Sequence, residues 1–300
     1  MTLREKIQSD ALIVTAELGP PQHGDGQSVR KKCNHFRKGV DGINITDNQT
    51  GIVRMSSIAT AVLVSEEKLE PVIQMTCRDR NRIALQSDLL GAAALGIENV
   101  LCLTGDHQKF GNHPEARGVY DVDSVQLVAM VNRMNEGFFL SGDPIDPPPK
   151  FLIGAAANPF AEPFEFRLTR LAKKIEAGAR FIQTQAVFDL ERFRVWMQGV
   201  RGLGLHRKAA ILAGVLPVRS GKAIRYMKEE VSGILIPDTL IERMDRADDP
   251  KEEGIRIAVE IIRELRREEG VRGIHLMPVM WESITPRILE EAGLIEETKH

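Results

Sequence analysis

Cysteine, aromatic residues and net charge are all scarce in this sequence. The 300 residues include three cysteines, Cys33, Cys77 and Cys102, which are widely spaced and form no Cys-x-x-Cys pair. This spacing argues against a disulfide framework or a cysteine-based zinc site and favours a reducing compartment. Aromatic residues make up only 5% of the chain. No run of about 18 consecutive apolar residues occurs, so we expect no membrane-spanning helix.

The charge balance excludes two further classes of partner. The formal net charge is −2, and lysine and arginine are dispersed along the chain, so the sequence lacks the basic patch that a nucleic acid or an anionic membrane surface requires. The first residues show no apolar segment typical of a signal peptide. With 43% hydrophobic and 27% charged residues, the composition is that of an ordinary globular protein, and we expect it to be cytoplasmic.

Short apolar runs alternate with longer amphipathic segments along the chain. This alternation is typical of βα units that form a parallel sheet. Eight such runs are present, which is the number that closes a barrel, so the sequence predicts an α/β fold with one parallel (β/α)8 TIM-type barrel spanning residues 1–300. The predicted strands are 12–18, 42–46, 71–77, 100–104, 151–157, 180–187, 209–216 and 273–277.

Amphipathic segments between these runs predict the outer helices. The last crossover is longer than the others and contains extra helical segments at about 237–270, before the last strand. A proline-rich run at 143–149 is too short to separate two domains. The predicted helices are 29–37, 81–95, 124–134, 164–177 and 223–230, followed by 239–246 and 252–269 in the extended crossover.

Glu17 is the sharpest candidate for catalysis. Active sites of such barrels are built at the carboxyl ends of the strands, and Glu17 stands near the end of the first predicted strand. A carboxyl group in an apolar strand at a barrel mouth can retain a proton and act as a general acid. A strand-end glutamate paired with a nearby arginine or lysine is the alternative interpretation.

Asp106 and Gln185 are further candidates at strand ends. Asp106 follows Gly105, which would let a flat ligand approach the backbone while the carboxylate meets its polar edge. A helix N-cap or loop aspartate is the alternative. Gln185 can donate and accept hydrogen bonds at the edge of a pterin or flavin ring, whereas a buried glutamine paired with a neighbouring strand is the more ordinary explanation.

Positive charge precedes the sixth predicted strand. Arg170, Lys173 and Lys174 are suited to a diphosphate, although a solvated helix face is the default interpretation of such a run. His107 and His113 have no cysteine or glutamate partners at ligand spacing, so we predict no metal site. No Gly-x-Gly-x-x-Gly follows a strand, and a Rossmann dinucleotide site is therefore not indicated.

Several strand-end motifs occur in a characteristic order over nearly the whole chain. Together they resemble the methylenetetrahydrofolate reductase family. The motifs are Glu17-x-x-Pro20-Pro21, Leu103-x-Gly105-Asp106, Lys174-x-x-x-Ala177-Gly178-Ala179, Thr184-Gln185-x-x-Phe188-Asp189 and Gly214-Val215-Leu216-Pro217-Val218.

The resemblance implies a bound FAD and the reduction of 5,10-methylenetetrahydrofolate to 5-methyltetrahydrofolate. By this resemblance Glu17 would be the general acid that helps to open the imidazolidine ring, and Asp106 would stabilise the developing cation and tune the flavin. Gln185 and Thr46 would contact the folate. The implied flavin contacts are Thr76, Leu103, Thr104, Gly105, Asp106, Tyr120, Ala156, Asn158 and Lys174.

Some positions depart from the usual bacterial pattern. Gln74 and Asn158 stand where a histidine and a tyrosine are usual, and Ala223 and Met227 stand where a glutamine and a phenylalanine are usual. Methionine lacks the flat face that stacks on a nicotinamide ring. We therefore hypothesise that a partner redox protein supplies electrons in place of NAD(P)H or alongside it. Trp281 offers a ring for stacking, although a core or interface role is commoner for tryptophan.

Three rival functions stay open. Another flavin barrel, such as a proline-dehydrogenase-like enzyme, would also hold FAD but would oxidise an amino acid. A flavin-free pterin-binding methyltransferase barrel would purify colourless. A non-catalytic subunit would tolerate Glu17→Gln without measurable loss. Assembly as a homo- or hetero-oligomer is equally open, because no exposed apolar heptad is visible.

Overall fold

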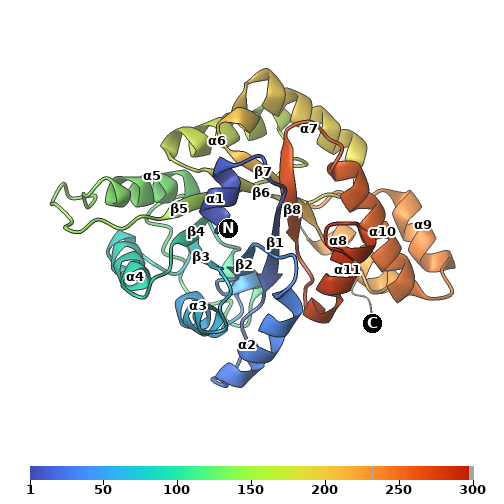
Figure 1. Ribbon diagram of the computed structural model, residues 1–300, viewed down its shortest axis with the longest axis horizontal. Helices are drawn as coiled ribbons and strands as arrows, with labels where there is room; N and C mark the ends of the chain where they lie inside the picture. The colour runs from blue at the N-terminus through green and yellow to red at the C-terminus, as the bar shows by residue number, and fades with distance from the viewer. Residues whose placement is uncertain (232, 297–300) are drawn as a thin grey trace.

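The predicted barrel is confirmed by the computed structural model, which describes residues 1–231 and 233–296. All strand pairs are parallel, and the strands follow one another around a closed barrel in chain order, with β8 beside β1 (Figure 1). Each predicted strand overlaps the observed one to within two residues at either end. The strands are β1 (Ile13–Leu18), β2 (Gly42–Ile45), β3 (Pro71–Thr76), β4 (Asn99–Leu103), β5 (Leu152–Ala157), β6 (Phe181–Ala186), β7 (Ala210–Val215) and β8 (Val271–Leu276).

Helices surround the barrel and cover the outer faces of the strands, except α1, which lies across one end (Figure 1). Four of them, α1, α3, α7 and α11, were not among the predicted ranges. No helix among the described residues combines the length and apolar character needed to cross a bilayer. The helices are α1 (Leu3–Gln8), α2 (Gly26–Cys33), α3 (Ser57–Glu66), α4 (Arg82–Ala94), α5 (Ser124–Asn135), α6 (Phe164–Ala177), α7 (Leu190–Gly202), α8 (Gly221–Glu230), α9 (Asp238–Arg246), α10 (Pro250–Leu265) and α11 (Thr285–Glu291).

Two local differences from the predicted helices have physical causes. The helix predicted at 29–37 begins earlier, because the carboxylate of Asp25 accepts a hydrogen bond from the Gln27 amide and caps α2. After Cys33 the chain continues as a short 3-10 helix, Asn34–Phe36. Helix α3 is apolar over most of its length and its apolar residues surround the axis, so it shows little of the periodicity that identifies a helix from sequence.

An apolar plug closes the amino-terminal end of the barrel. Helix α1 lies across the middle of the ring of strands (Figure 1), and its Leu3 is fully buried against Ile13, Val72 and Phe181. The backbone amide of Leu3 donates to both carboxylate oxygens of Glu70, at 3.0 and 2.9 Å, which ties the helix to the chain just before β3. The base of the barrel is therefore a packed core, and a cavity inside the barrel must lie at the other end.

Gly154 in β5 is required by this plug. A Cβ added to Gly154 would lie 2.1 Å from the ring carbon Cζ of Phe181, whose side chain is fully buried. We predict that Gly154→Ala lowers the free energy of unfolding by about 1–3 kcal/mol, because the ring has no space into which to move. Urea unfolding measures the change.

The matched control is Gly91→Ala in α4. Gly91 is exposed, and a Cβ there would meet no atom within 4 Å. Alanine is favoured over glycine inside a helix, so this variant should gain about 0.5–1 kcal/mol of stability. Equal effects of the two substitutions would contradict the proposed packing at Gly154.

Candidate active site

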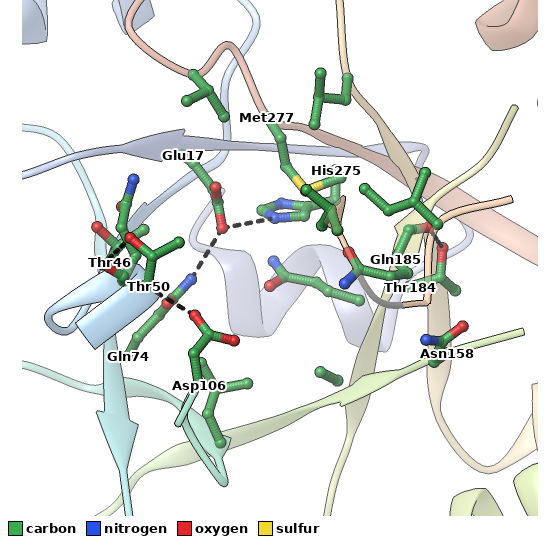
Figure 2. Close-up of a pocket in the computed structure, with 18 of the residues that line it drawn as sticks. Glu17, Thr46, Thr50, Gln74, Asp106, Asn158, Thr184, Gln185, His275 and Met277 are labelled. Carbon is green, nitrogen blue, oxygen red and sulfur yellow. Dashed lines mark hydrogen bonds and ion pairs between the residues drawn. The ribbon is translucent and has the colours of Figure 1, made fainter. Parts of the chain in front are cut away.

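A cavity of about 1050 Å³ lies at the carboxyl ends of the strands. Residues at or just after the end of every strand line it, together with side chains from α6 and α8. Figure 2 shows several of the strand-end residues around the cavity. All the predicted site residues line this cavity except Tyr120. The predicted residues brought together are Glu17, Thr46, Thr76, Leu103, Thr104, Gly105, Asp106, Ala156, Asn158, Lys174 and Gln185.

Glu17 projects from β1 into the interior of the cavity, and its side chain is 21% exposed. Gln74 of β3 donates a hydrogen bond from Nε2 to Glu17 Oε1 at 3.1 Å. Nε2 of His275, from β8, lies 3.6 Å from the same oxygen (Figure 2). No arginine or lysine pairs with Glu17 among the described residues, so the simple surface ion pair that was its alternative interpretation is not what the structure has.

A buried polar layer supports Glu17 from below. Thr15 Oγ1 lies 2.9 Å from His275 Nδ1 and accepts a hydrogen bond from Gln183 Nε2 at 3.0 Å. The amides of Gln183 and Asn44 exchange two hydrogen bonds, of 2.7 and 2.9 Å. Because these buried groups satisfy one another, the layer fixes the side chains on which Glu17 rests.

The residues of this layer were missed at the level of motifs, although a signal for them exists. Alternate residues of a strand point to the same side, and the polar pairs stand two residues apart on several strands. The inward pairs are Thr15 and Glu17, Asn44 and Thr46, Gln74 and Thr76, and Gln183 and Gln185.

Asp106 faces the cavity from the loop after β4. Its carboxylate Oδ2 accepts a hydrogen bond from the backbone amide of Thr50 at 2.8 Å, and its carbonyl accepts one from Arg78 Nη1 at 3.0 Å. Gly105 has φ of +89°, and a Cβ there would lie 3.0 Å from Cβ of Thr76. Glycine is therefore needed at this position for conformation and for space. Figure 2 shows the Glu17 and Asp106 carboxylates turned toward the same space.

A buried ion pair stabilises the strand ends beside Asp106. Asp47, almost completely buried, accepts hydrogen bonds from the backbone amide and the hydroxyl of Thr76, both at 2.9 Å. Arg80 Nη1 donates to the same Asp47 oxygen at 2.7 Å. The Thr76 hydroxyl donates its hydrogen bond to Asp47. Its oxygen can therefore still accept a hydrogen bond from a ligand.

Positive charge lines the opposite wall. Arg167, Arg170 and Lys174 lie on one face of α6 and line the cavity, whereas Lys173 is exposed and does not. The cationic face therefore contains Arg167 in place of the predicted Lys173. Positions i, i+3 and i+7 of a helix share a face, and these are the positions of Arg167, Arg170 and Lys174. Burial, and then the charge of Arg170, lower the pKa of Lys174 to about 8. Its Nζ donates to the Ala156 carbonyl at 2.7 Å.

The remaining predicted residues occupy different parts of the site. Asn158 lies on the β5 side (Figure 2). Its Oδ1 accepts a hydrogen bond from the Phe160 amide at 2.9 Å. Gln185 also lines the cavity, from β6. Tyr120 lies outside the cavity wall with 37% of its surface exposed, so its contact with a flavin stays a prediction.

Helix α8 forms part of the rim. Ala223 and Met227 both line the cavity. Trp281 does not line it, and its ring lies under the guanidinium of Arg219, with 5.8 Å between the guanidinium carbon and the ring centroid. No group of three or more histidine, cysteine, aspartate or glutamate side chains in the described part of the chain could hold a metal ion.

Comparison with protein families agrees with this geometry. A family model described as methylenetetrahydrofolate reductase matches residues 2–293. The chain belongs to the methylenetetrahydrofolate reductase family. Each of the motifs that indicated this family contributes at least one residue to the cavity: Glu17, Leu103, Lys174, Thr184 and Leu216 are examples.

Curated relatives carry the family name. The chain is 24% identical to methylenetetrahydrofolate reductase 1 of Schizosaccharomyces pombe over 244 residues, covering 79% of this chain and 38% of that protein. It is 27% identical to 5,10-methylenetetrahydrofolate reductase of Pectobacterium carotovorum over 215 residues, covering 69% of this chain and 64% of that protein. The chain therefore spans well under half of the length of the yeast relative.

A solved structure shares the fold. It is an uncharacterized protein from Clostridium thermocellum that binds two copies of 5-methyl-5,6,7,8-tetrahydrofolic acid. The two chains superpose with a TM-score of 0.67 at 16% sequence identity, over 97% of this chain and 96% of that one.

Lys174 gives a test of the charged wall. With its pKa lowered from 10.5 to about 8, the folded protein releases the lysine proton at a lower pH than the unfolded chain does. Stability should therefore rise as pH increases from about 8 to 10.5, because the unfolded state then holds more protons. Relative to Lys174→Met, the unaltered protein should gain up to about 3 kcal/mol of unfolding free energy across this range. Urea unfolding at a series of pH values measures the gain.

The matched control is Lys173→Met, which removes an exposed lysine from the same helix. This variant should keep the pH dependence of the unaltered protein. Parallel curves for the unaltered protein and for Lys174→Met would show that Lys174 is not buried as a charged group.

Proposed function

We propose that this chain reduces 5,10-methylenetetrahydrofolate to 5-methyltetrahydrofolate with FAD as its cofactor. The observation that carries the proposal is the convergence of Glu17 and Asp106 on one cavity, from β1 and β4, above a fixed polar layer. Family membership and the curated relatives support the activity. The folate named for the Clostridium thermocellum structure supports the substrate class.

The residues present fit FAD. Arg167, Arg170 and Lys174 offer positive charge suited to a diphosphate, and Gly105 leaves the backbone open beside the cavity wall. The cavity, at about 1050 Å³, is at the upper end of the range for sites that hold large ligands. When bound, FAD supplies the hydride. The residues that would hold it are Thr76, Leu103, Thr104, Gly105, Asp106, Ala156, Asn158 and Lys174, with Tyr120 at the edge.

The chain's own residues supply acid, charge and orientation. Glu17 donates the proton to the folate nitrogen that leaves as the imidazolidine ring opens. Asp106 carries a negative charge opposite the cation that this opening creates. Gln185 and Thr46 orient the folate through hydrogen bonds. The layer of Thr15, His275 and Gln183 beneath Glu17 keeps the acid in place as the proton moves, since its members are bonded to one another.

Electrons for the flavin are proposed to come from a partner redox protein as well as from NAD(P)H, or instead of it. Met227, at the α8 rim, offers no flat ring to a nicotinamide. Among the described residues that line the cavity, Tyr226 is the one with a phenyl ring, and its side chain is 61% exposed. The rim is thus open on the side where a donor would approach.

Glu17→Gln tests the proposed acid. The unaltered protein, loaded with FAD under anaerobic conditions, should show a flavin spectrum that 5-methyltetrahydrofolate bleaches. Glu17→Gln should bind FAD with an unchanged spectrum and bleach about 10²- to 10⁴-fold more slowly, which is the usual contribution of a general acid. Stopped-flow absorbance measures both rates.

Glu70→Gln is the matched control, because Glu70 is another partly buried glutamate at the opposite end of the barrel. Its bleaching rate should stay close to that of the unaltered protein. A protein that neither binds FAD nor responds to 5-methyltetrahydrofolate would refute the reductase proposal and favour a methyltransferase or a non-catalytic subunit.

Met227→Phe tests the electron source. In the unaltered protein, NADH alone should reduce the flavin slowly. A phenyl ring at position 227 should increase that rate by up to about tenfold, because ring stacking is worth roughly 0.5–1.5 kcal/mol. Anaerobic reduction by NADH, followed by absorbance, measures the effect. Rapid reduction of the unaltered protein by NADH would contradict the need for a protein donor.

A further inference from the structure

The segment after β2 carries polar atoms that no protein group satisfies. Oγ1 of Thr46 and Oε1 of Gln49 are both buried, and neither has a hydrogen-bond partner within the described residues. Both residues line the cavity. Thr46 as a whole is only 3% exposed. Because unpaired buried acceptors are rare and costly in proteins, these two atoms need an explanation.

Hydrogen bonds to Asn48 and Thr50, on either side of Gln49, hold the backbone of this segment in place. Its neighbours Asn48 and Thr50 both have left-handed backbone conformations, with φ of 46° and 56°. Such conformations persist in residues other than glycine only when the surroundings enforce them. Arg78 Nη2 donates to the Asn48 carbonyl at 3.1 Å, the Arg54 amide donates to Asn48 Oδ1 at 2.9 Å, and the Thr50 amide donates to Asp106.

A second loop prevents this segment from sliding. The short 3-10 helix Gln49–Gly51 packs against the 3-10 helix Gln108–Phe110. A Cβ added to Gly111 would lie 1.9 Å from the Gly51 carbonyl oxygen, so the two backbones are in direct contact. The backbone at Gln49 is therefore held in place beside the cavity.

Gln49 also lies on the same side of the cavity as the proposed acid. Its Oε1 is 3.7 Å from the point where a Cβ on Gly19 would stand. Gly19 is two residues after Glu17, immediately beyond the end of β1, and residues two apart along a strand direction share a side. The Gln49 amide therefore lies next to the chain that leaves β1, close in sequence to Glu17.

We propose that Gln49 is a folate-binding residue whose amide oxygen accepts a hydrogen bond from an N–H group of the reduced pterin ring. This inference rests on the proposed function and adds a residue that sets substrate specificity. A reduced pterin has several N–H donors, and the groups on this side, Glu17, Asp106, Thr46 and Gln49, all present acceptor oxygens. An oxidised flavin ring has a single N–H and several acceptors, and so matches this wall less well.

The experiment compares Gln49→Leu with the unaltered protein. FAD-loaded protein is first reduced with dithionite, so that 5-methyltetrahydrofolate binds without transferring electrons, and its Kd is measured anaerobically by calorimetry. Gln49→Leu should raise this Kd roughly three- to tenfold, the usual effect of losing one neutral hydrogen bond. The Kd for FAD should stay unchanged. The melting temperature of the ligand-free protein should stay the same or rise, because leucine removes an unpaired buried acceptor.

Gln108→Leu is the matched control. Oε1 of Gln108 is also buried and has no partner in the described part of the chain, but Gln108 does not line the cavity. This variant should therefore leave the Kd for 5-methyltetrahydrofolate unchanged.

Four outcomes would overturn the inference. An unchanged folate Kd in Gln49→Leu would show that Gln49 does not bind the pterin. A lower melting temperature, or equal weakening in both variants, would show a structural role. A weakened Kd for FAD alone would assign Gln49 to the flavin. Failure of the unaltered protein to bind 5-methyltetrahydrofolate at all would instead refute the proposed function, and this inference with it.

Discussion

Alternation of side chains along the strands governs the interior of this molecule. In a closed parallel barrel every second residue of each strand points inward, and the eight strands together have to fill that interior. At the base the inward residues are apolar, and Phe181 and Leu3 pack there without space for a further carbon atom beside Gly154. One step higher they are amides, hydroxyls and an imidazole that satisfy one another. The uppermost residues, together with parts of this polar layer, line the cavity.

The polar upper part of the barrel costs stability, because it buries polar and charged groups near the mouth. Asp47 and Arg80 are buried as a hydrogen-bonded pair, which leaves little net electrostatic gain but fixes two strand ends. Lys174 has a carbonyl as its hydrogen-bond acceptor instead of a carboxylate, so its charge is less well compensated. Such local conflicts between stability and environment are typical of functional sites.

The sequence predicted the barrel well because its strands are short, apolar and regularly spaced. Most outer helices were also evident, but α3 was not, because its nearly uniform apolar face carries no helical period. For the site, the motifs led to Glu17 and Asp106, which stand at strand ends, and to Lys174 on α6. Polar residues two apart on the strands indicate that such a layer exists, but its pairings and the position of Gln49 could not be predicted. They depend on contacts between segments far apart in the chain, such as Asn44 with Gln183 and Thr50 with Asp106. Lys173 shows the reverse case, because a residue next to Lys174 in the sequence lies on another face of the helix and does not line the cavity.

The plug formed by α1 determines how ligands enter and leave the cavity. With Leu3 and Phe181 filling the base of the barrel, the described cavity exchanges its contents with solvent at the carboxyl ends of the strands. A large molecule that has entered must leave by the route along which it came. Two such molecules that need the same inner position can therefore bind only one after the other. The closed base of the barrel imposes this order without any moving part.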